Sequence, residues 1–159
     1  MGVDRPIVLL VEDNLDHARL VMRGFAKHCV ANEVRHVEDG EAALDYLFRR
    51  GDYADPETSP APTIVLLDLR LPRLDGLQVL QEIKHSPLKD IPVIILTTSS
   101  GEQDIAKAYE YRANSYLVKP IDFPELTKMI DDICSYWLAW NRYPNSTGSP
   151  VGMLSGRDC

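Results

Sequence analysis

The sequence predicts an α/β protein built on a five-stranded parallel sheet with helices on both faces. Short apolar runs without polar alternation recur along the chain, a pattern typical of strands that are buried on both faces. Each run is followed by a segment with apolar residues at helical spacing, and about twenty to thirty residues separate successive strands. We therefore expect a doubly wound sheet of five strand and helix units.

The first two units occupy the N-terminal third of the chain. Residues 6–11 predict a strand that ends in Glu12-Asp13. Asn14 can cap the helix that follows, in which apolar residues recur at helical spacing. Residues 33–37 predict a weaker strand, and Asp39-Gly40 marks the turn into a second helix.

The third unit, residues 63–76, contains a carboxylate at the end of a buried strand. Residues 64–67 predict that strand, and Asp68 follows directly. Pro72 ends regular pairing, and Asp75-Gly76 offers cap or turn chemistry before a helix. Ligands of open α/β sheets bind outside the carboxyl ends of the strands, so Asp68 is a candidate functional residue. The alternative is that Asp68 only caps a loop.

Two further units complete the sheet. Residues 92–96 predict a strand that leads into the hydroxyl run 97–100, and residues 101–112 predict a helix. Residues 115–118 predict the fifth strand, which runs into Lys119-Pro120. From Asp122 we expect a longer helix with an apolar stripe facing the core. The stripe consists of Leu126, Ile130, Ile133, Trp137 and Trp140.

Two segments lack apolar periodicity. Residues 51–62 are rich in Pro, Asp and Ser, and they are expected to form an exposed loop. From Asn141 onward the Pro, Ser and Gly content rises and the apolar pattern fades. We therefore expect one domain, residues 5–141, followed by a disordered tail, residues 142–159.

Composition argues against several classes of function. The 159 residues carry a net charge of −7 with scattered Lys and Arg, so the sequence has no basic stripe for nucleic acid. The apolar runs are too short to cross a bilayer or to form a signal peptide, which predicts a cytoplasmic protein. Three cysteines without CxxC spacing predict free thiols rather than a disulfide framework or a zinc site. Four histidines without ligand-like pairing, His17 among them, are expected at solvated positions.

The order of the strands decides which side chains meet. Right-handed crossovers limit the topology to a few choices, among them the flavodoxin-like order 2-1-3-4-5. In that order the first and third strands are neighbours, so Glu12 and Asp13 would meet Asp68. Thr97 and Lys119 end the fourth and fifth strands and would lie at the same edge.

Such a cluster has a definite chemistry. Three carboxylates beside one Lys leave a net charge of −2, which one divalent ion balances. All-oxygen ligands suit Mg²⁺, and Mn²⁺ can substitute. A hard cation, a Lys and a hydroxyl are equipped to hold the oxygens of a transferring phosphoryl group. Asp68 would then be the nucleophile and needs no general base, because a free carboxyl group ionises near pH 4.

These residues together resemble the receiver domain of two-component response regulators over about residues 5–140. The resemblance implies transfer of a phosphoryl group from the phosphohistidine of a histidine kinase to Asp68. It implies Mg²⁺ bound by Asp13, Asp68 and the backbone carbonyl of Arg70, with Glu12 acting through water. Lys119 would pair with the phosphate.

The resemblance also implies further features. Thr97 and Tyr116 would form the family's switch pair, and the Lys119–Pro120 bond is expected to be cis. Loop 51–62, the IPVIILTTSS run and the YWLAWNRYP ending resemble single-domain regulators that partner phytochromes. Arg70 and the branched Thr98 depart from the usual pattern, and both flank the path of the water that would hydrolyse the phosphate.

The last helix carries more apolar surface than one buried face needs. Met129, Tyr136 and Trp140 extend this surface around the helix, which predicts a homodimer through the fourth helix, fifth strand and fifth helix.

The protein would be a phosphoacceptor rather than an enzyme. The first alternative is a phosphate-independent adaptor. The second is an aspartyl-nucleophile phosphatase, which commonly carries an acid two residues after its nucleophile, where this chain has Arg70. A nucleotide-binding flavodoxin-like protein is the third, but the sequence contains neither GxGxxG nor GxxxxGK.

Overall fold

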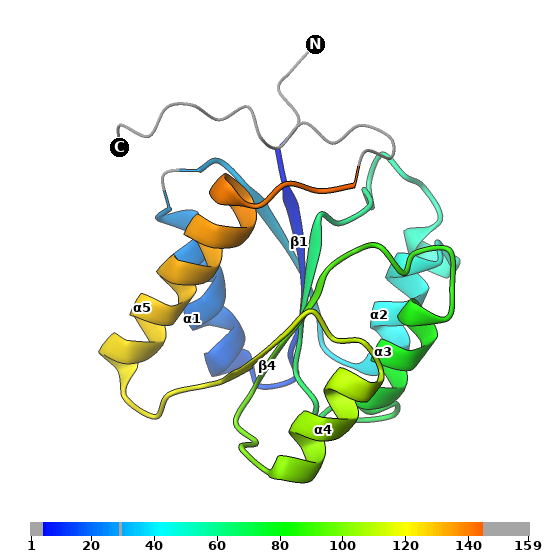
Figure 1. Ribbon diagram of the computed structural model, residues 1–159. Coiled ribbons are helices and arrows are strands. Elements are labelled where there is room, and N and C mark those ends of the chain that lie inside the picture. Colours follow the sequence, from blue (N-terminus) through cyan, green and yellow to red (C-terminus); the bar gives the residue numbers. More distant parts are fainter. Residues whose placement is uncertain (1–4, 29, 145–159) are drawn as a thin grey trace.

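A computed structural model describes residues 5–28 and 30–144 of the chain (Figure 1). Within these residues five strands form one sheet in the order β2-β1-β3-β4-β5, and every neighbouring pair is parallel. The flavodoxin-like order predicted from the sequence is confirmed. The strands are β1 (Ile7–Val11), β2 (Glu33–Val37), β3 (Ile64–Leu67), β4 (Val93–Thr97) and β5 (Ser115–Val118).

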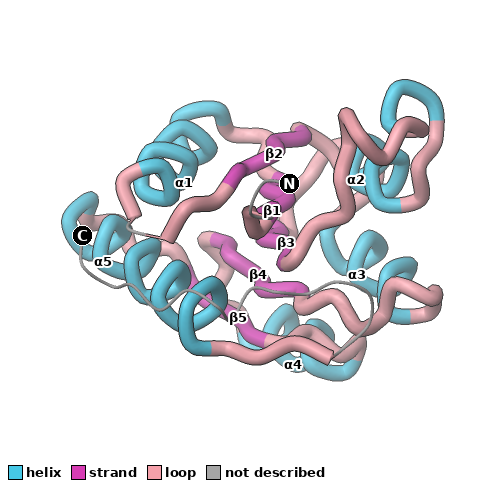
Figure 2. The backbone as a smooth tube through the Cα atoms, turned by 90° about the horizontal axis from the view of Figure 1, so that it is seen from above, coloured by secondary structure: helices cyan, strands magenta, loops and turns pink. Residues whose placement is uncertain are grey.

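Helices cover both faces of the sheet. They are α1 (Leu15–Ala26), α2 (Gly40–Leu47), α3 (Gly76–Lys84), α4 (Glu102–Glu110) and α5 (Phe123–Ile133). Helices α1 and α5 pack together on one face, and α2, α3 and α4 lie on the other (Figures 1 and 2). None of the helices in the described part of the chain is long and apolar enough to cross a membrane.

Each of the central strands contributes side chains to two apolar cores. In β3, Val65 and Leu67 face the core under α2 and α3, whereas Ile64 and Leu66 face the core under α1 and α5. All four side chains are fully buried. Both faces are therefore apolar, which explains why these strands show no polar alternation in the sequence.

Side-chain caps fix where the helices begin. Asn14, Asp39, Asp75 and Asp122 each accept hydrogen bonds from backbone amides in the first turn of the following helix. At the start of α3, a Cβ atom on Gly76 would overlap the backbone carbonyl of Asp68. Only glycine therefore lets α3 begin directly against the strand end that carries Asp68.

The last helix differs from the prediction. Helix α5 ends at Ile133, and the chain continues as a π-helical segment, η2 (Cys134–Trp140). The wider π turns shift the buried positions, so Cys134 and Leu138 are buried while Trp140 is 74% exposed. Trp140 was predicted both in the core stripe and in the excess apolar surface of the helix, and its exposure shows that the first of these predictions is wrong. Leu126, Ile130 and Ile133 are buried as predicted.

Residues 51–62, predicted to form an exposed loop, are partly buried and partly regular in structure. The segment begins with a short 3₁₀ turn, η1 (Gly51–Tyr53), and most of its residues are exposed. Ser59, however, is buried, and the Tyr46 hydroxyl donates a 2.7 Å hydrogen bond to the carbonyl of Pro60. This contact attaches the segment to α2. Most of the tail predicted at 142–159 lies outside the described residues, as do Cys29 and Cys159, whereas Cys134 is a buried free thiol.

Candidate functional site

The predicted site residues lie together at the carboxyl edge of the sheet. Glu12 follows β1, Asp68 follows β3, Thr97 ends β4 and Lys119 follows β5. Strand pairing holds their backbones side by side, because the Asp68 amide donates to the Val11 carbonyl at 3.1 Å and the Lys119 amide to the Thr97 carbonyl at 2.7 Å. The order β2-β1-β3-β4-β5 thus brings residues from four strands to one place.

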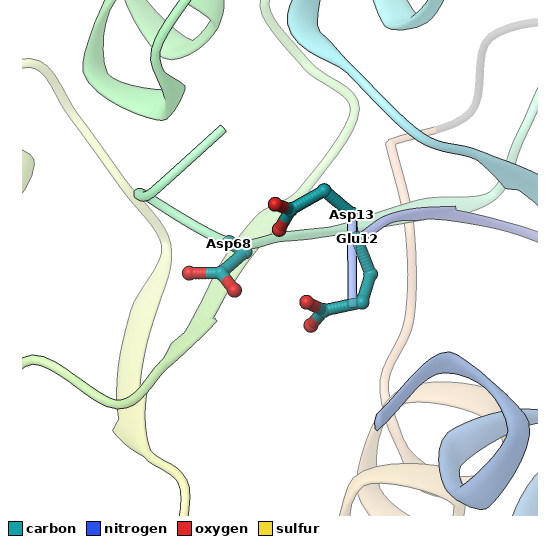
Figure 3. A group of neighbouring side chains, drawn as sticks. All are labelled: Glu12, Asp13 and Asp68. Carbon is teal, nitrogen blue, oxygen red and sulfur yellow. The ribbon is translucent and has the colours of Figure 1, made fainter. Parts of the chain in front are cut away.

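Three carboxylates gather at this edge (Figure 3). Glu12, Asp13 and Asp68 each offer one oxygen, and these oxygens lie within 4.8 Å of one another. Glu12 and Asp68 are buried, whereas Asp13 is exposed. An all-oxygen cluster that is open on one side fits a hard divalent cation that keeps part of its water shell.

Lys119 joins two of these carboxylates. Its ammonium donates to Glu12 Oε1 at 2.5 Å and to Asp68 Oδ2 at 3.2 Å. The Lys119 side chain is 3% exposed, so both ion pairs are shielded from solvent. A buried cation therefore lies within hydrogen-bond distance of the candidate nucleophile.

The pKa values of the two buried carboxyl groups, Glu12 and Asp68, are shifted in opposite directions. Burial raises the pKa of Glu12 to about 7, although Lys119 acts against this shift. Burial would also raise the pKa of Asp68, but the charge of Lys119 and hydrogen bonds from Thr97 and Arg70 outweigh it and lower the pKa. Asp68 is therefore ionised at neutral pH, and Glu12 holds a proton for part of the time.

A second network reaches from Asp68 toward α4. The Arg70 amide donates to Asp68 Oδ1 at 3.2 Å, and the Arg70 guanidinium pairs with Asp104 Oδ2 at 2.9 Å. The Ser99 hydroxyl donates to the same Asp104 oxygen at 2.5 Å, and the Tyr116 hydroxyl donates to the Ser99 carbonyl at 2.9 Å. A cavity of about 350 Å³ next to the site is lined in part by Arg70 and Asp104.

Sequence reasoning missed some of these residues. His17 was expected at a solvated position, but its Nδ1 lies 3.0 Å from Lys119 Nζ. Three residues after Asn14, it falls in the first turn of a helix that starts at a strand end, and this placement was a usable signal. No such signal pointed to Asp104.

One expectation drawn from the resemblance is wrong. The described residues contain no cis peptide bond, so the Lys119–Pro120 bond is trans. The trans form is the more stable isomer of an X–Pro bond.

The chain belongs to the response regulator receiver family, since residues 8–131 match the family described as the response regulator receiver domain. Among its relatives is the probable methanogenesis regulatory protein FilR2 of Methanothrix harundinacea. FilR2 is 46% identical over 139 residues, which are 87% of this chain and 87% of FilR2. Response regulator Rcp1 of Synechocystis sp. is 44% identical over 133 residues, 83% of this chain and 88% of Rcp1.

Solved structures of two relatives share the fold. The Mn²⁺-bound form of Rcp1 matches with a TM-score of 0.82 and 42% identity, covering 87% of this chain and 99% of that one. The phosphorylated cyanobacterial phytochrome response regulator RcpA matches with a TM-score of 0.85 and 38% identity, covering 89% of this chain and 100% of RcpA.

Proposed function

We propose that this receiver domain accepts a phosphoryl group on Asp68 from the phosphohistidine of a histidine kinase, with Mg²⁺ as cofactor. The observation that carries the proposal is an ionised, buried Asp68 with the Lys119 ammonium 3.2 Å from its Oδ2, inside a cluster of three carboxylates. That arrangement pairs a nucleophile with positive charge for the incoming phosphoryl oxygens.

The chain's own residues divide the work of transfer. An oxygen of Asp68 attacks phosphorus while the bond from phosphorus to the kinase imidazole breaks, and the electron pair leaves with that imidazole. Lys119 pairs with a phosphoryl oxygen and limits the charge that builds up there. Asp13, Asp68 and the Arg70 carbonyl would hold Mg²⁺, with Glu12 acting through water. The metal supplies further neutralisation of the phosphoryl charge.

The phosphoryl donor in this proposal is another protein, and exposed apolar residues on the segments that border the site support this. Leu15 at the start of α1 and Phe123 at the start of α5 are exposed, and Ile121 between β5 and α5 is fully exposed. These residues flank His17 and Lys119 in the sequence, so apolar surface is available on both segments that border the site. RcpA is described as a phytochrome regulator, and on that likeness we propose a phytochrome-type kinase as the partner.

We further propose that phosphorylation is read at α4, β5 and α5. Tyr116 is tied to the loop after Thr97 by its hydrogen bond to Ser99, so movement of the Thr97 hydroxyl toward a phosphoryl group would be felt at Tyr116. Exposed aromatic side chains on α4 (Tyr109) and on η2 (Tyr136 and Trp140) support a homodimer through these elements.

Incubation with Mg²⁺ and acetyl phosphate, followed by intact mass measurement, tests the proposal. We expect the mass of one phosphate on the parent and none on Asp68→Asn. Retention of phosphate by Asp68→Asn would contradict the assignment. A parent that takes up none is expected of a phosphate-independent adaptor, and rapid hydrolysis of the donor without a phosphorylated protein at steady state is expected of a phosphatase.

A further inference from the structure

His17 and Lys119 are members of a closed ring of hydrogen bonds. The Asn14 amide donates to Glu12 Oε2 at 3.1 Å, and the His17 amide donates to Asn14 Oδ1 at 3.1 Å. Lys119 Nζ closes the ring by meeting His17 Nδ1 at 3.0 Å and Glu12 Oε1 at 2.5 Å. The cap of α1 and the lysine after β5 are thereby joined across 102 residues of sequence.

The three contacts of Lys119 use all of its donor hydrogens. An ammonium group has three hydrogens, and Glu12, Asp68 and His17 each accept one. The orientation of the ammonium is therefore fixed on three sides. Two of the acceptors are carboxylates whose charge changes with cation binding or phosphorylation. His17 is the acceptor that those events leave unchanged.

Only an uncharged imidazole can serve in this way. Lys119 has no acceptor atom, so His17 Nδ1 must carry a lone pair and its hydrogen must be on Nε2. Burial and the nearby charge of Lys119 lower the pKa of His17, which keeps its imidazole neutral at physiological pH. A neutral acceptor also adds no negative charge that would compete with a phosphoryl group for Lys119.

We propose that His17 is a positioning residue for Lys119, holding the ammonium in place while the hydrogen that it donates to Asp68 turns to an oxygen of the incoming phosphoryl group. The inference rests on the proposed function of Asp68 and adds to it a residue on α1. The structural support is the ring itself, because the Asn14 cap fixes the backbone of His17 and His17 in turn fixes Lys119.

The test separates the acceptor atom of His17 from its bulk. His17→Asn keeps an acceptor oxygen near the position of Nδ1, whereas His17→Leu removes the acceptor and keeps an apolar side chain of similar size. His85→Leu is the matched control, because His85 Nδ1 contacts only a carbonyl of its own helix, that of Gln81. The initial rate of phosphorylation is followed with acetyl phosphate at saturating Mg²⁺.

We expect His17→Leu to be slower than the parent by about fivefold, the factor that corresponds to the net value of one ordinary hydrogen bond. His17→Asn should recover most of the rate, and His85→Leu should equal the parent. Equal rates for His17→Leu and the parent would overturn the positioning role. So would a His17→Asn variant as slow as His17→Leu, since bulk rather than the acceptor atom would then matter.

A measurement without phosphate keeps this inference distinct from the proposed function. Nitrogen NMR of the imidazoles at pH 8 should show His17 with Nδ1 unprotonated and hydrogen-bonded, and the Nδ1 shift should change in Lys119→Met. An unchanged shift would overturn the inference even if Asp68 is phosphorylated. If the His17 Nδ1 shift changes in Lys119→Met but the parent takes up no phosphate, the contact between His17 and Lys119 stands. The proposed function is then overturned, and with it the positioning role.

Discussion

At the scale of single residues, the proposed binding of Mg²⁺ would compete with protonation at Glu12. Without metal the pKa of Glu12 is raised to about 7 because the side chain is buried, while Asp13 and Asp68 complete a cluster of oxygens within 4.8 Å. A cation favours the ionised form of Glu12, so Mg²⁺ must displace a proton below pH 7. Mg²⁺ affinity should therefore rise as the pH increases from 6 to 8, by at most about tenfold per pH unit.

Thermal unfolding checks this expectation. Mg²⁺ held at the proposed site would stabilise the native state, so the melting temperature should rise with Mg²⁺, and more at pH 8 than at pH 6. Asp13→Ala should lose most of the rise, whereas Asp131→Ala, an exposed carboxylate on α5, should keep it. A rise in Asp13→Ala equal to that of the parent would remove Asp13 from the site.

The sequence was sufficient to predict the residues at the strand ends but not the side-chain contacts that support them. Glu12, Asp68 and Lys119 each follow an apolar run, and parallel strands bring such residues to one edge whatever the side-chain details. The contact between His17 and Lys119 depends instead on one rotamer of each side chain. No periodicity in the sequence encodes that choice.

At the scale of elements, the loop after β3 is attached to α4 by the ion pair between Arg70 and Asp104. Thr98 is exposed beside the buried Thr97 at the end of β4. The likeness to receiver domains implies that both Arg70 and Thr98 border the path of water to Asp68, and we propose on that ground that they slow hydrolysis of the phosphate. The double variant Arg70→Asn/Thr98→Ala should therefore dephosphorylate faster than the parent.

The variant Asp104→Ala keeps Arg70 but removes the carboxylate that holds its guanidinium, so it tests whether the placement of the Arg70 side chain matters. It should hasten dephosphorylation by no more than about fivefold, since an exposed ion pair contributes at most about 1 kcal/mol. Release of inorganic phosphate after removal of the donor measures the rate. Arg73→Asn is the control, because Arg73 in the same loop pairs with Asp39 and Glu41 instead. Equal or slower release from the double variant would show that these side chains do not shield the phosphate.

The end of the last helix shows a limit of pattern analysis at this scale. Residues 134–140 are CSYWLAW, and apolar side chains occur at both helical and π-helical spacings. A 3.6-residue period selects Trp137 and Trp140, whereas the structure buries Cys134 and Leu138. Packing against α1 and the sheet decides between the two, and a one-dimensional pattern does not contain that information.

At the scale of the whole molecule, one side of the protein has apolar surface in excess. Tyr136 is 53% exposed and Trp140 is 74% exposed, and a groove of about 710 Å³ between β5 and the last helix is lined in part by Leu117, Met129 and Trp137. Because the sheet ends at β5, this face borders an open strand edge. A second copy of the chain would cover it.

Sedimentation velocity tests the dimer. The parent should sediment as a dimer at micromolar concentration, at least with phosphodonor, and Tyr136→Glu/Trp140→Glu should sediment as a monomer because the added charges would be buried without partners. Leu15→Glu is the control, since it places a charge at an exposed apolar position on α1. If the double variant sediments as the parent does in both states, the final helix is not the interface.

The central claim is that Asp68 carries the phosphate, and the identity of the modified residue tests it most directly. Borohydride reduces an acyl phosphate to an alcohol, so a phosphorylated aspartate is left with the side chain of homoserine, which peptide mapping by mass spectrometry locates. After treatment with acetyl phosphate and Mg²⁺, we expect reduction at position 68 alone, and none when Mg²⁺ is removed by a chelator. Reduction at Asp13 or at another carboxylate, with position 68 unmodified, would contradict the account.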